Sequence, residues 1–170
     1  MAKVGLFYGS TNGNTAEGAE EIQKALGGSS VVELFDISDV EVADMMKYDY
    51  LIIGSSTWNT GELQDDWDEK FDDLDALDFS GKTVAYFGYG DQIGYADNFI
   101  DAVGKLEEKI TGCGGKTVGM WPTDGYEHDD SLALRNGKFC GLPLDEDNQS
   151  DKTEERIAAW TTQIKTAMSL

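Results

Sequence analysis

The stretch VGLFYGSTNGNT, residues 4–15, decides the fold, because a short apolar run enters a loop of small polar residues that leads into a helix. The letters VGLFY favour a buried strand, and Gly9 is expected to end it. The segment AEGAEEIQKAL that follows carries its apolar residues at helical spacing. The stretch therefore predicts a strand, a polar turn and a helix.

The turn of this unit predicts an anion site. Backbone N–H groups at the start of a helix have no partner within it and lie at the positive end of its dipole, so they bind a phosphate together with nearby hydroxyl groups. Neither GxxxxGK[ST] nor GxGxxG is present, which indicates a monophosphate rather than a nucleoside triphosphate or a dinucleotide. The alternative is that Thr15 or Asn14 simply caps the helix. The candidate phosphate ligands are Ser10, Thr11, Asn12, Gly13, Asn14 and Thr15.

Composition limits the possible chemistry. The 170 residues are 40% hydrophobic and 11% aromatic, which fits a single domain over 1–170, and with no apolar stretch of membrane-spanning length we expect a soluble, cytoplasmic protein. Cys113 and Cys140 lack CxxC spacing and His128 is the only histidine. We expect no metal site and no catalytic residue, so a cofactor would carry any redox chemistry.

The charge balance indicates the kind of partner. Thirteen basic residues stand against 33 acidic ones, a net charge of -20. This excludes general nucleic-acid binding and favours partners with basic surfaces. The alternative is that the acidic surface only confers solubility.

The remaining chain alternates strands and helices. Strands are expected at 31–37, 50–53 and 83–87, and a fifth begins at 116–121, is interrupted by the polar segment 122–138 and resumes at 139–144. Helices are expected at 40–46, 62–77, 99–110 and 152–168. Wholly apolar strands separated by helices predict a doubly wound α/β fold with a parallel sheet covered on both faces.

Three loops should meet at one site. Gly9, Gly54 and Gly88 are expected to end the first, third and fourth strands, and ligands bind doubly wound sheets beyond the carboxyl ends of the strands. Trp58 and Tyr95 lie in two of these loops. Aromatic side chains in loops usually belong to the packing, but a pair flanking a phosphate site suits a flat ring such as a flavin.

Several motifs together resemble the flavodoxin family in its long-chain group, along essentially the whole chain. They are the turn 10–15, TWNTGELQ at 57–64, GDQIGYADNF at 90–99, LDEDNQSD at 144–151 and the insertion 122–138 that splits the fifth strand. The resemblance implies a flavodoxin-like five-stranded parallel sheet in the order 2-1-3-4-5 and a bound FMN.

The resemblance also implies roles for individual residues. The turn 10–15 would hold the FMN phosphate, and Trp58 and Tyr95 would sandwich the isoalloxazine ring. Thr57 and Asp147 would reach the ribityl hydroxyls, and Asp91 with its loop backbone would bind the polar pyrimidine edge.

A further implied feature is the turn beside flavin N5. The Asn59-Thr60 peptide would reorient on reduction to accept the N5–H of the neutral semiquinone, and Gly61 would make that change easy. The chain departs from the commoner family pattern at Thr11-Asn12, where glutamine and threonine are frequent, and at Thr60, which is often apolar.

The segment 62–78 carries nine acids against one base, Lys70. A unit charge about 10 Å from a flavin, at an effective dielectric of about 20, opposes an added electron by roughly 1.7 kcal/mol before solvent screening reduces it. These charges predict a strongly reducing hydroquinone and steering of basic partners. The alternative is a merely solvated helix face.

Three function hypotheses follow. The first is a monomeric one-electron carrier using the semiquinone/hydroquinone couple of FMN; by resemblance it would serve photosystem I and ferredoxin–NADP reductase, or nitrogenase, as a ferredoxin substitute. The second is an NAD(P)H:quinone reductase, disfavoured because Tyr95 would cover the flavin. The third is a response-regulator module, disfavoured because Tyr8-Gly9-Ser10 lacks an acidic cluster.

Overall fold

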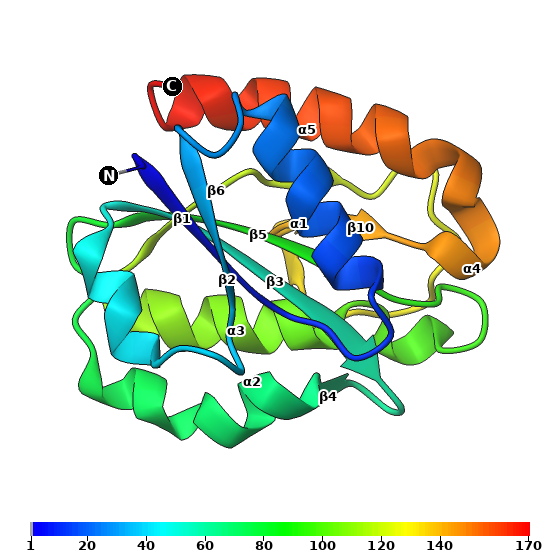
Figure 1. Ribbon diagram of the computed structural model, residues 1–170. Helices are drawn as coiled ribbons and strands as arrows, with labels where there is room; N and C mark the ends of the chain where they lie inside the picture. Colours follow the sequence, from blue (N-terminus) through cyan, green and yellow to red (C-terminus); the bar gives the residue numbers. More distant parts are fainter. Residues whose placement is uncertain (1) are drawn as a thin grey trace.

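A twisted parallel sheet forms the centre of the computed structural model, which describes residues 2–170 (Figure 1). Its central strands lie in the order β2-β1-β3-β5, and both β6 and β10 pair in parallel with β5. Because β6 pairs with the first half of β5 and β10 with its last residues, the two together occupy the fifth position, and the predicted order 2-1-3-4-5 is confirmed. The strands are β1 (Val4–Gly9), β2 (Val32–Asp36), β3 (Tyr50–Trp58), β5 (Thr83–Tyr89), β6 (Lys116–Val118) and β10 (Leu142–Leu144), with β4 (Glu62–Leu63) antiparallel to β3.

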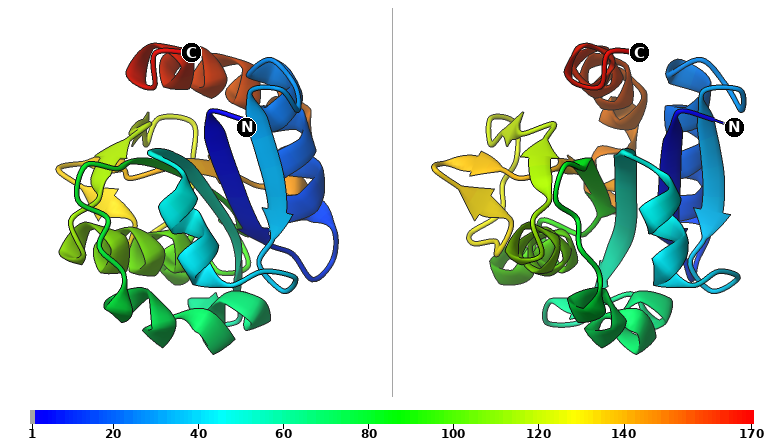
Figure 2. Two further views of the ribbon diagram at one scale, coloured as in Figure 1. Left: turned by 60° about the vertical axis from the view of Figure 1, so that its left-hand side comes forward. Right: turned by 90° about the vertical axis from the view of Figure 1, so that its left-hand side faces the viewer.

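Helices cover both faces of the sheet (Figures 1 and 2). The α-helices α1 (Asn14–Ala25) and α5 (Thr153–Ala167) pack together over one face, while α3 (Asp101–Gly112) and α2 (Asp65–Lys70) lie on the other. None of the helices within residues 2–170 has both the length and the apolar character needed to cross a membrane. The shorter helical segments are η1 (Val42–Lys47), η2 (Asp72–Ala76), η3 (Ala96–Asn98), α4 (Glu146–Gln149) and η4 (Ser150–Lys152).

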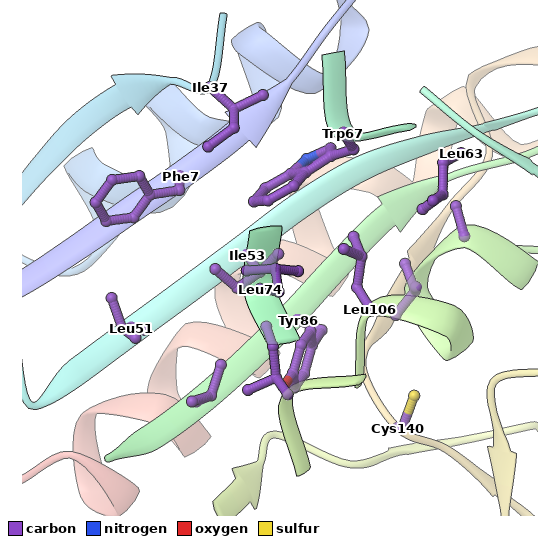
Figure 3. Packing of buried hydrophobic residues seen from close by; sticks show 14 of the residues in the cluster. Phe7, Ile37, Leu51, Ile53, Leu63, Trp67, Leu74, Tyr86, Leu106 and Cys140 are labelled. Atoms are coloured by element: carbon purple, nitrogen blue, oxygen red, sulfur yellow. The ribbon is translucent and has the colours of Figure 1, made fainter. Parts of the chain in front are cut away.

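Two hydrophobic clusters lie on opposite faces of the sheet. Successive strand residues point to opposite sides, so Leu6 joins the cluster under α1 and α5, while Phe7 joins the cluster against α2 and α3. Trp67 and Tyr86 lie in the second cluster (Figure 3). Burial on both faces explains why the predicted strands are apolar without alternation.

The acidic segment differs from the single helix expected over 62–77. Glu62 and Leu63 form β4, and Gln64 then starts α2 by accepting hydrogen bonds from the N–H groups of Asp66 and Trp67. A separate turn of 3-10 helix, η2, follows. The apolar residues of this segment still face the core. A strand, an α-helix and a 3-10 helix in succession can bury residues that are three or four positions apart.

Two glycines expected to end strands lie inside them. A Cβ atom on Gly54 would be 2.2 Å from Cζ of Phe87, and one on Gly88 would be 2.4 Å from Cγ2 of Val103. These glycines therefore allow a close approach of neighbouring elements rather than a turn. As a result β3 continues through the polar residues Ser55, Ser56 and Thr57, which were expected in a loop.

The insertion contains a small antiparallel sheet made of β7 (Trp121–Pro122), β8 (Leu134–Arg135) and β9 (Lys138–Phe139). The assignment of Trp121 and Phe139 to the fifth strand was therefore wrong. They pair with each other across β7 and β9, and the ring of Phe139 packs against Phe99 and His128. The insertion 122–138 does separate the two halves of the fifth strand, as predicted.

Candidate functional site

A pocket lies where β3 and β5 end and α1 begins. It brings together eight of the residues selected from the sequence: Asn12, Asn14, Thr57, Trp58, Asn59, Asp91, Tyr95 and Asp147. It also contains four that sequence reasoning missed: Ser56, Tyr89, Gly90 and Glu146. The three predicted loops therefore do meet at one edge of the sheet, and α4 joins them.

The N-terminus of α1 has the geometry of an anion site. Gly13 occupies the N-cap position with φ +94° and has no side chain that could cap the helix. Ser10 Oγ accepts a hydrogen bond from Gly13 N at 3.1 Å, and Asn12 Oδ1 accepts one from Asn14 N at 3.2 Å, which closes the turn. The alternative of a simple cap by Thr15 or Asn14 is thus not observed, and N–H groups at the start of a helix that lack a partner within it suit an external anion.

The hydroxyl of Thr15 has a different partner. Thr15 is fully buried, and its Oγ1 lies 2.6 Å from Oγ of Ser56 near the end of β3. This bond joins the start of α1 to the middle strand of the sheet. Ser56 was missed because its polar run was interpreted as loop; alternation along a longer β3 would have directed it toward α1.

Trp58 ends β3 at the wall of the pocket. Its Nε1 is buried and lacks a hydrogen-bond partner within residues 2–170. A buried donor without a partner is unusual in native proteins, so this atom marks a place where a bound group would complete the structure. Tyr95 lines the same pocket with 46% of its surface exposed.

A tight turn connects β3 to β4. Trp58 pairs with Glu62 across the hairpin, and Asn59 and Gly61 both adopt left-handed conformations, with φ of +47° and +87°. Asn59 lines the pocket, Thr60 is exposed, and Gly61 is buried against α3. Asn59 Nδ2 donates to Glu62 Oε2 at 2.9 Å, which fixes the side of the turn next to the pocket.

The carboxylate of Asp91 shapes the loop after β5. Its Oδ1 accepts hydrogen bonds from Gly94 N at 2.7 Å, from Asn148 Nδ2 at 2.8 Å and from Ile93 N at 3.1 Å. Burial alone would raise the pKa of Asp91, but these bonds outweigh it and hold the pKa below its ordinary value. Asp91 therefore organises the loop that carries Tyr95.

A second carboxylate, Asp145, connects this loop to α4. It is fully buried and accepts hydrogen bonds from Gln92 N at 3.0 Å, from Gln92 Nε2 at 2.8 Å and from Asn148 N at 3.1 Å. Gln92 Oε1 in turn accepts a bond from Glu127 N in the insertion at 2.6 Å. Sequence reasoning missed Asp145, because nothing in the pattern DED distinguishes the buried acid from its half-buried and exposed neighbours, Glu146 and Asp147.

The surroundings of the pocket are strongly acidic. Burial, together with Asp91, Asp145 and Glu146, raises the pKa of Asp147 above its ordinary value. The acidic segment 62–78 starts next to the α1 turn, where Gln64 Nε2 donates to Thr11 Oγ1 at 3.2 Å.

The one lysine of that segment bonds to backbone carbonyls and forms no ion pair with a carboxylate among the described residues. Lys70 Nζ donates to the backbone carbonyls of Ile37, at 2.6 Å, and of Val40. Eight of the nine acidic side chains of the segment are exposed, and the ninth, that of Asp66, is half-buried.

Comparison with known proteins gives a consistent result. The sequence model of the flavodoxin family matches residues 6–160. The flavodoxin of Picosynechococcus sp. is 61% identical over 170 residues, which is the full length of both chains. A flavodoxin of Nostoc sp. is 60% identical over 168 residues, covering 99% of this chain and 98% of that one. A crystal structure of Fusobacterium nucleatum flavodoxin bound to flavin mononucleotide has a TM-score of 0.92 at 32% identity, covering 98% of this chain and 99% of that one.

A doubly wound sheet with a ligand pocket at the carboxyl ends of its strands defines an α/β protein of the nucleotide-binding class. With the matches above, the chain belongs to the flavodoxin family. It is an electron-transfer flavoprotein rather than an enzyme with a substrate of its own.

Proposed function

We propose that the protein binds FMN in the pocket between α1, β3 and the loop after β5, and carries single electrons between other redox proteins. The observation that carries the proposal is the combination, in one pocket, of a helix N-terminus whose N-cap residue is a glycine and two aromatic side chains. The Fusobacterium nucleatum relative of the same fold is bound to FMN, which supports the proposal. The whole chain, 1–170, acts as one FMN-binding domain.

The FMN phosphate binds at the start of α1. The ligands are the backbone N–H groups of the first turn together with the side chains of the turn 10–15. Neutral groups hold the dianion, since residues 4–15 contain neither lysine nor arginine. The ligands proposed are Ser10, Thr11, Asn12, Gly13, Asn14 and Thr15, with Ser56 orienting the hydroxyl of Thr15.

The isoalloxazine ring lies between Trp58 and Tyr95. Each offset-stacked aromatic pair contributes about 0.5–1.5 kcal/mol beyond the burial of area. The unpartnered Nε1 of Trp58, within the described residues, supports an acceptor on the ligand beside it. The 46% exposure of Tyr95 leaves its ring free to settle on a flat ligand.

The polar parts of FMN contact the two neighbouring loops. Thr57 and Asp147 reach the ribityl chain, although Thr57 Oγ1 also accepts a bond from Ala102 N at 3.1 Å. The pyrimidine edge binds the backbone of the loop after β5. Asp91 supports that contact indirectly, because its Oδ1 is already bonded to the N–H groups of its own loop.

The turn between β3 and β4 borders flavin N5. When bound, FMN would supply one-electron chemistry, and a backbone carbonyl at Asn59-Thr60 would accept a hydrogen bond from the N–H at that edge of the flavin. The left-handed residues on either side of Thr60, Asn59 and Gly61, allow that peptide to change orientation while β3 and β4 stay in place.

The acidic segment sets both the redox potential of the bound flavin and the choice of partner proteins. Its exposed carboxylates oppose the electron that would add a negative charge to the flavin, so the protein works at the more reducing one-electron couple of FMN. The same charges attract basic surfaces and raise association rates at low salt. Nucleic acid is not a partner for a chain with a net charge of -20.

The partners proposed are ferredoxin–NADP reductase and photosystem I, with nitrogenase as a further acceptor and the protein substituting for ferredoxin. The similarity to cyanobacterial flavodoxins supports this choice. The protein acts as a monomer in the cytoplasm, a reducing compartment in keeping with the free thiols of Cys113 and Cys140.

Stepwise reduction tests the proposal. Apoprotein titrated with FMN should quench flavin fluorescence with a 1:1 end point, and potentiometric titration should give two separate one-electron midpoints, the second well below that of free FMN. A Trp58→Leu variant should weaken binding, whereas Trp121→Leu, in the small sheet, serves as a matched control. A protein that takes up no FMN, or one that takes it up and is reduced directly by NADPH with turnover of quinone, would contradict the proposal.

A further inference from the structure

The turn between β3 and β4 is held from outside the pocket by the N-terminal part of α3. Three contacts converge on it. Lys105 Nζ donates to the carbonyl of Gly61 at 2.6 Å, and Ala102 N donates to Thr57 Oγ1 at 3.1 Å. The carboxylate of Asp101 is packed directly against Gly61, since a Cβ atom there would lie 2.6 Å from Asp101 Oδ2.

Asp101 is itself held firmly. It is 3% exposed, its Oδ1 accepts a bond from Leu132 N at 2.8 Å, and its Oδ2 accepts one from Asn98 Nδ2 at 3.3 Å. The start of α3 is therefore a rigid surface against which Gly61 rests. Of the three contacts, only the one from Lys105 grips the backbone of the turn itself.

Lys105 differs from its neighbour on α3 in the kind of partner that it has. Lys109, one helical turn further along α3, pairs with Asp75 at 2.8 Å, whereas Lys105, like Lys70, donates to a backbone carbonyl. Lys105 makes no ion pair within residues 2–170, although the chain carries 33 acids, and its ammonium goes to a carbonyl. A charge-assisted bond to a half-buried carbonyl holds it more strongly than a neutral donor would.

The position of this bond in the turn matters. Asn59 and Gly61 are left-handed, Thr60 between them is exposed, and Asn59 lines the pocket. The bond from Asn59 to Glu62 is made by a side chain. The strand pairing of Trp58 with Glu62 closes the turn, and within residues 2–170 Lys105 is the side chain that bonds to the backbone between them, at the Gly61 carbonyl. We therefore take Gly61 as the pivot of the peptide groups next to the pocket.

We propose that Lys105 is a positioning residue for the flavin: by holding the Gly61 carbonyl it fixes the pivot of the 59–61 turn, and so sets the orientation in which the backbone of Asn59-Thr60 meets a bound flavin. This inference rests on the proposed function, because it takes the pocket to be the flavin site. Lys105 is not among the residues that line the pocket, so it acts through the Gly61 carbonyl and not by touching the ligand.

Substitutions at Lys105 and Lys109 test the proposal. Lys105→Met removes the ammonium, Lys105→Arg keeps a cationic donor, and Lys109→Met removes an equal charge from the same helix. In the apoprotein, amide hydrogen exchange in the paired ends of β3 and β4, which flank the turn, should accelerate about tenfold in Lys105→Met, as for the loss of one charge-assisted bond. Exchange should stay near wild type in Lys105→Arg and Lys109→Met.

In the FMN-loaded protein, Lys105→Met should change the separation between the two midpoint potentials by about 59 mV. This corresponds to a tenfold change in the equilibrium constant between the redox states of a one-electron couple. Lys109→Met reports the effect of charge alone and should leave the separation nearly unchanged, and Lys105→Arg should restore it. Melting temperatures of the three variants distinguish a local effect from unfolding; if Lys105→Met does not fold, Lys105→Gln takes its place.

Equal exchange rates and equal potential separations in Lys105→Met and Lys109→Met would overturn the role of Lys105 while leaving the flavin site intact. A wild-type protein that takes up no FMN would instead refute the proposed function. In that case the apoprotein exchange data still decide whether Lys105 fixes the turn.

Discussion

Replacing Asp145 by asparagine tests how the two loops of the pocket are held together. The carboxylate is fully buried, and the described residues provide no cation within salt-bridge distance. Its charge is balanced only by N–H donors, from Gln92 and Asn148. The substitution keeps the volume of the side chain and replaces one acceptor oxygen by a donor group.

The expected cost follows from the number of bonds. Gln92 N and Nε2 both bond to Oδ2, and Asn148 N bonds to Oδ1, so either orientation of the new amide opposes at least one N–H with another donor. A hydrogen bond to a charged group contributes about 1.5–3 kcal/mol, and an unsatisfied buried donor costs about 1–3 kcal/mol. Loss of the buried charge itself offsets part of this. We expect Asp145→Asn to lower the free energy of unfolding by about 2–4 kcal/mol.

Urea unfolding of the apoprotein measures this loss. With a slope of about 2 kcal/mol per molar urea, the midpoint should fall by about 1–2 M. FMN affinity should fall as well, because Gln92 lies next to Asp91 in the loop that carries Tyr95. Asp151→Asn, at an exposed position near α5, is the matched control and should change neither quantity. An unfolding midpoint within 0.2 M (roughly 0.4 kcal/mol at this slope) of wild type would refute the reasoning, since removal of the buried charge would then compensate for the lost bonds.

Three further predictions concern packing, charge and pH. Gly18→Ala should destabilise the protein by about 1 kcal/mol, because the new Cβ would lie 2.5 Å from the Tyr89 hydroxyl and overpacking outweighs the gain in helix propensity; urea unfolding should show partial recovery when Tyr89→Phe is added, and additive losses would contradict this. Asp65→Asn with Asp68→Asn should raise the more reducing midpoint potential by tens of millivolts at low salt and less at high salt; a potential independent of both charge and salt would show that the acidic segment is only a solvated face. Burial, together with neighbouring glutamates, raises the pKa of Glu21, so its contribution to stability is present below its unfolded-state pKa and is lost as pH rises through the folded-state pKa; Glu21→Gln should therefore melt higher than wild type at pH 7, the gap should narrow toward pH 5, and a constant gap would exclude the effect.

Local sequence was sufficient for the elements that depend on local chemistry. The opening strand, its polar turn and α1 follow from residue types along a dozen positions, because strand burial and helix spacing are properties of neighbouring residues. The meeting of three loops at one edge also followed, since parallel strands in a doubly wound sheet end on the same side. For this reason the sequence alone places Trp58 and Tyr95 in loops at the same edge of the sheet.

Other features depend on contacts between distant residues. Gly54 was expected to end a strand, but Phe87 from the neighbouring strand occupies the space that its side chain would need. Trp121 and Phe139 have the apolar character of a fifth strand, yet they pair with each other, because within residues 2–170 it is Lys116–Val118 and Leu142–Leu144 that pair with β5 on the side opposite β3. Several chain segments of equal apolar character could pair with the same edge of the sheet. The path of the chain that connects these segments decides which of them does so.

The supporting residues of the pocket show the same division. Asp145 and Lys105 have the composition of ordinary surface residues, and no spacing rule sets them apart from the other acids and lysines of the chain. Their roles arise because folding brings Gln92 to one and the Gly61 carbonyl to the other, across 53 and 44 residues of sequence. Amphipathic patterns report which side of an element is buried, whereas the partner of a buried charge is set only when the elements pack.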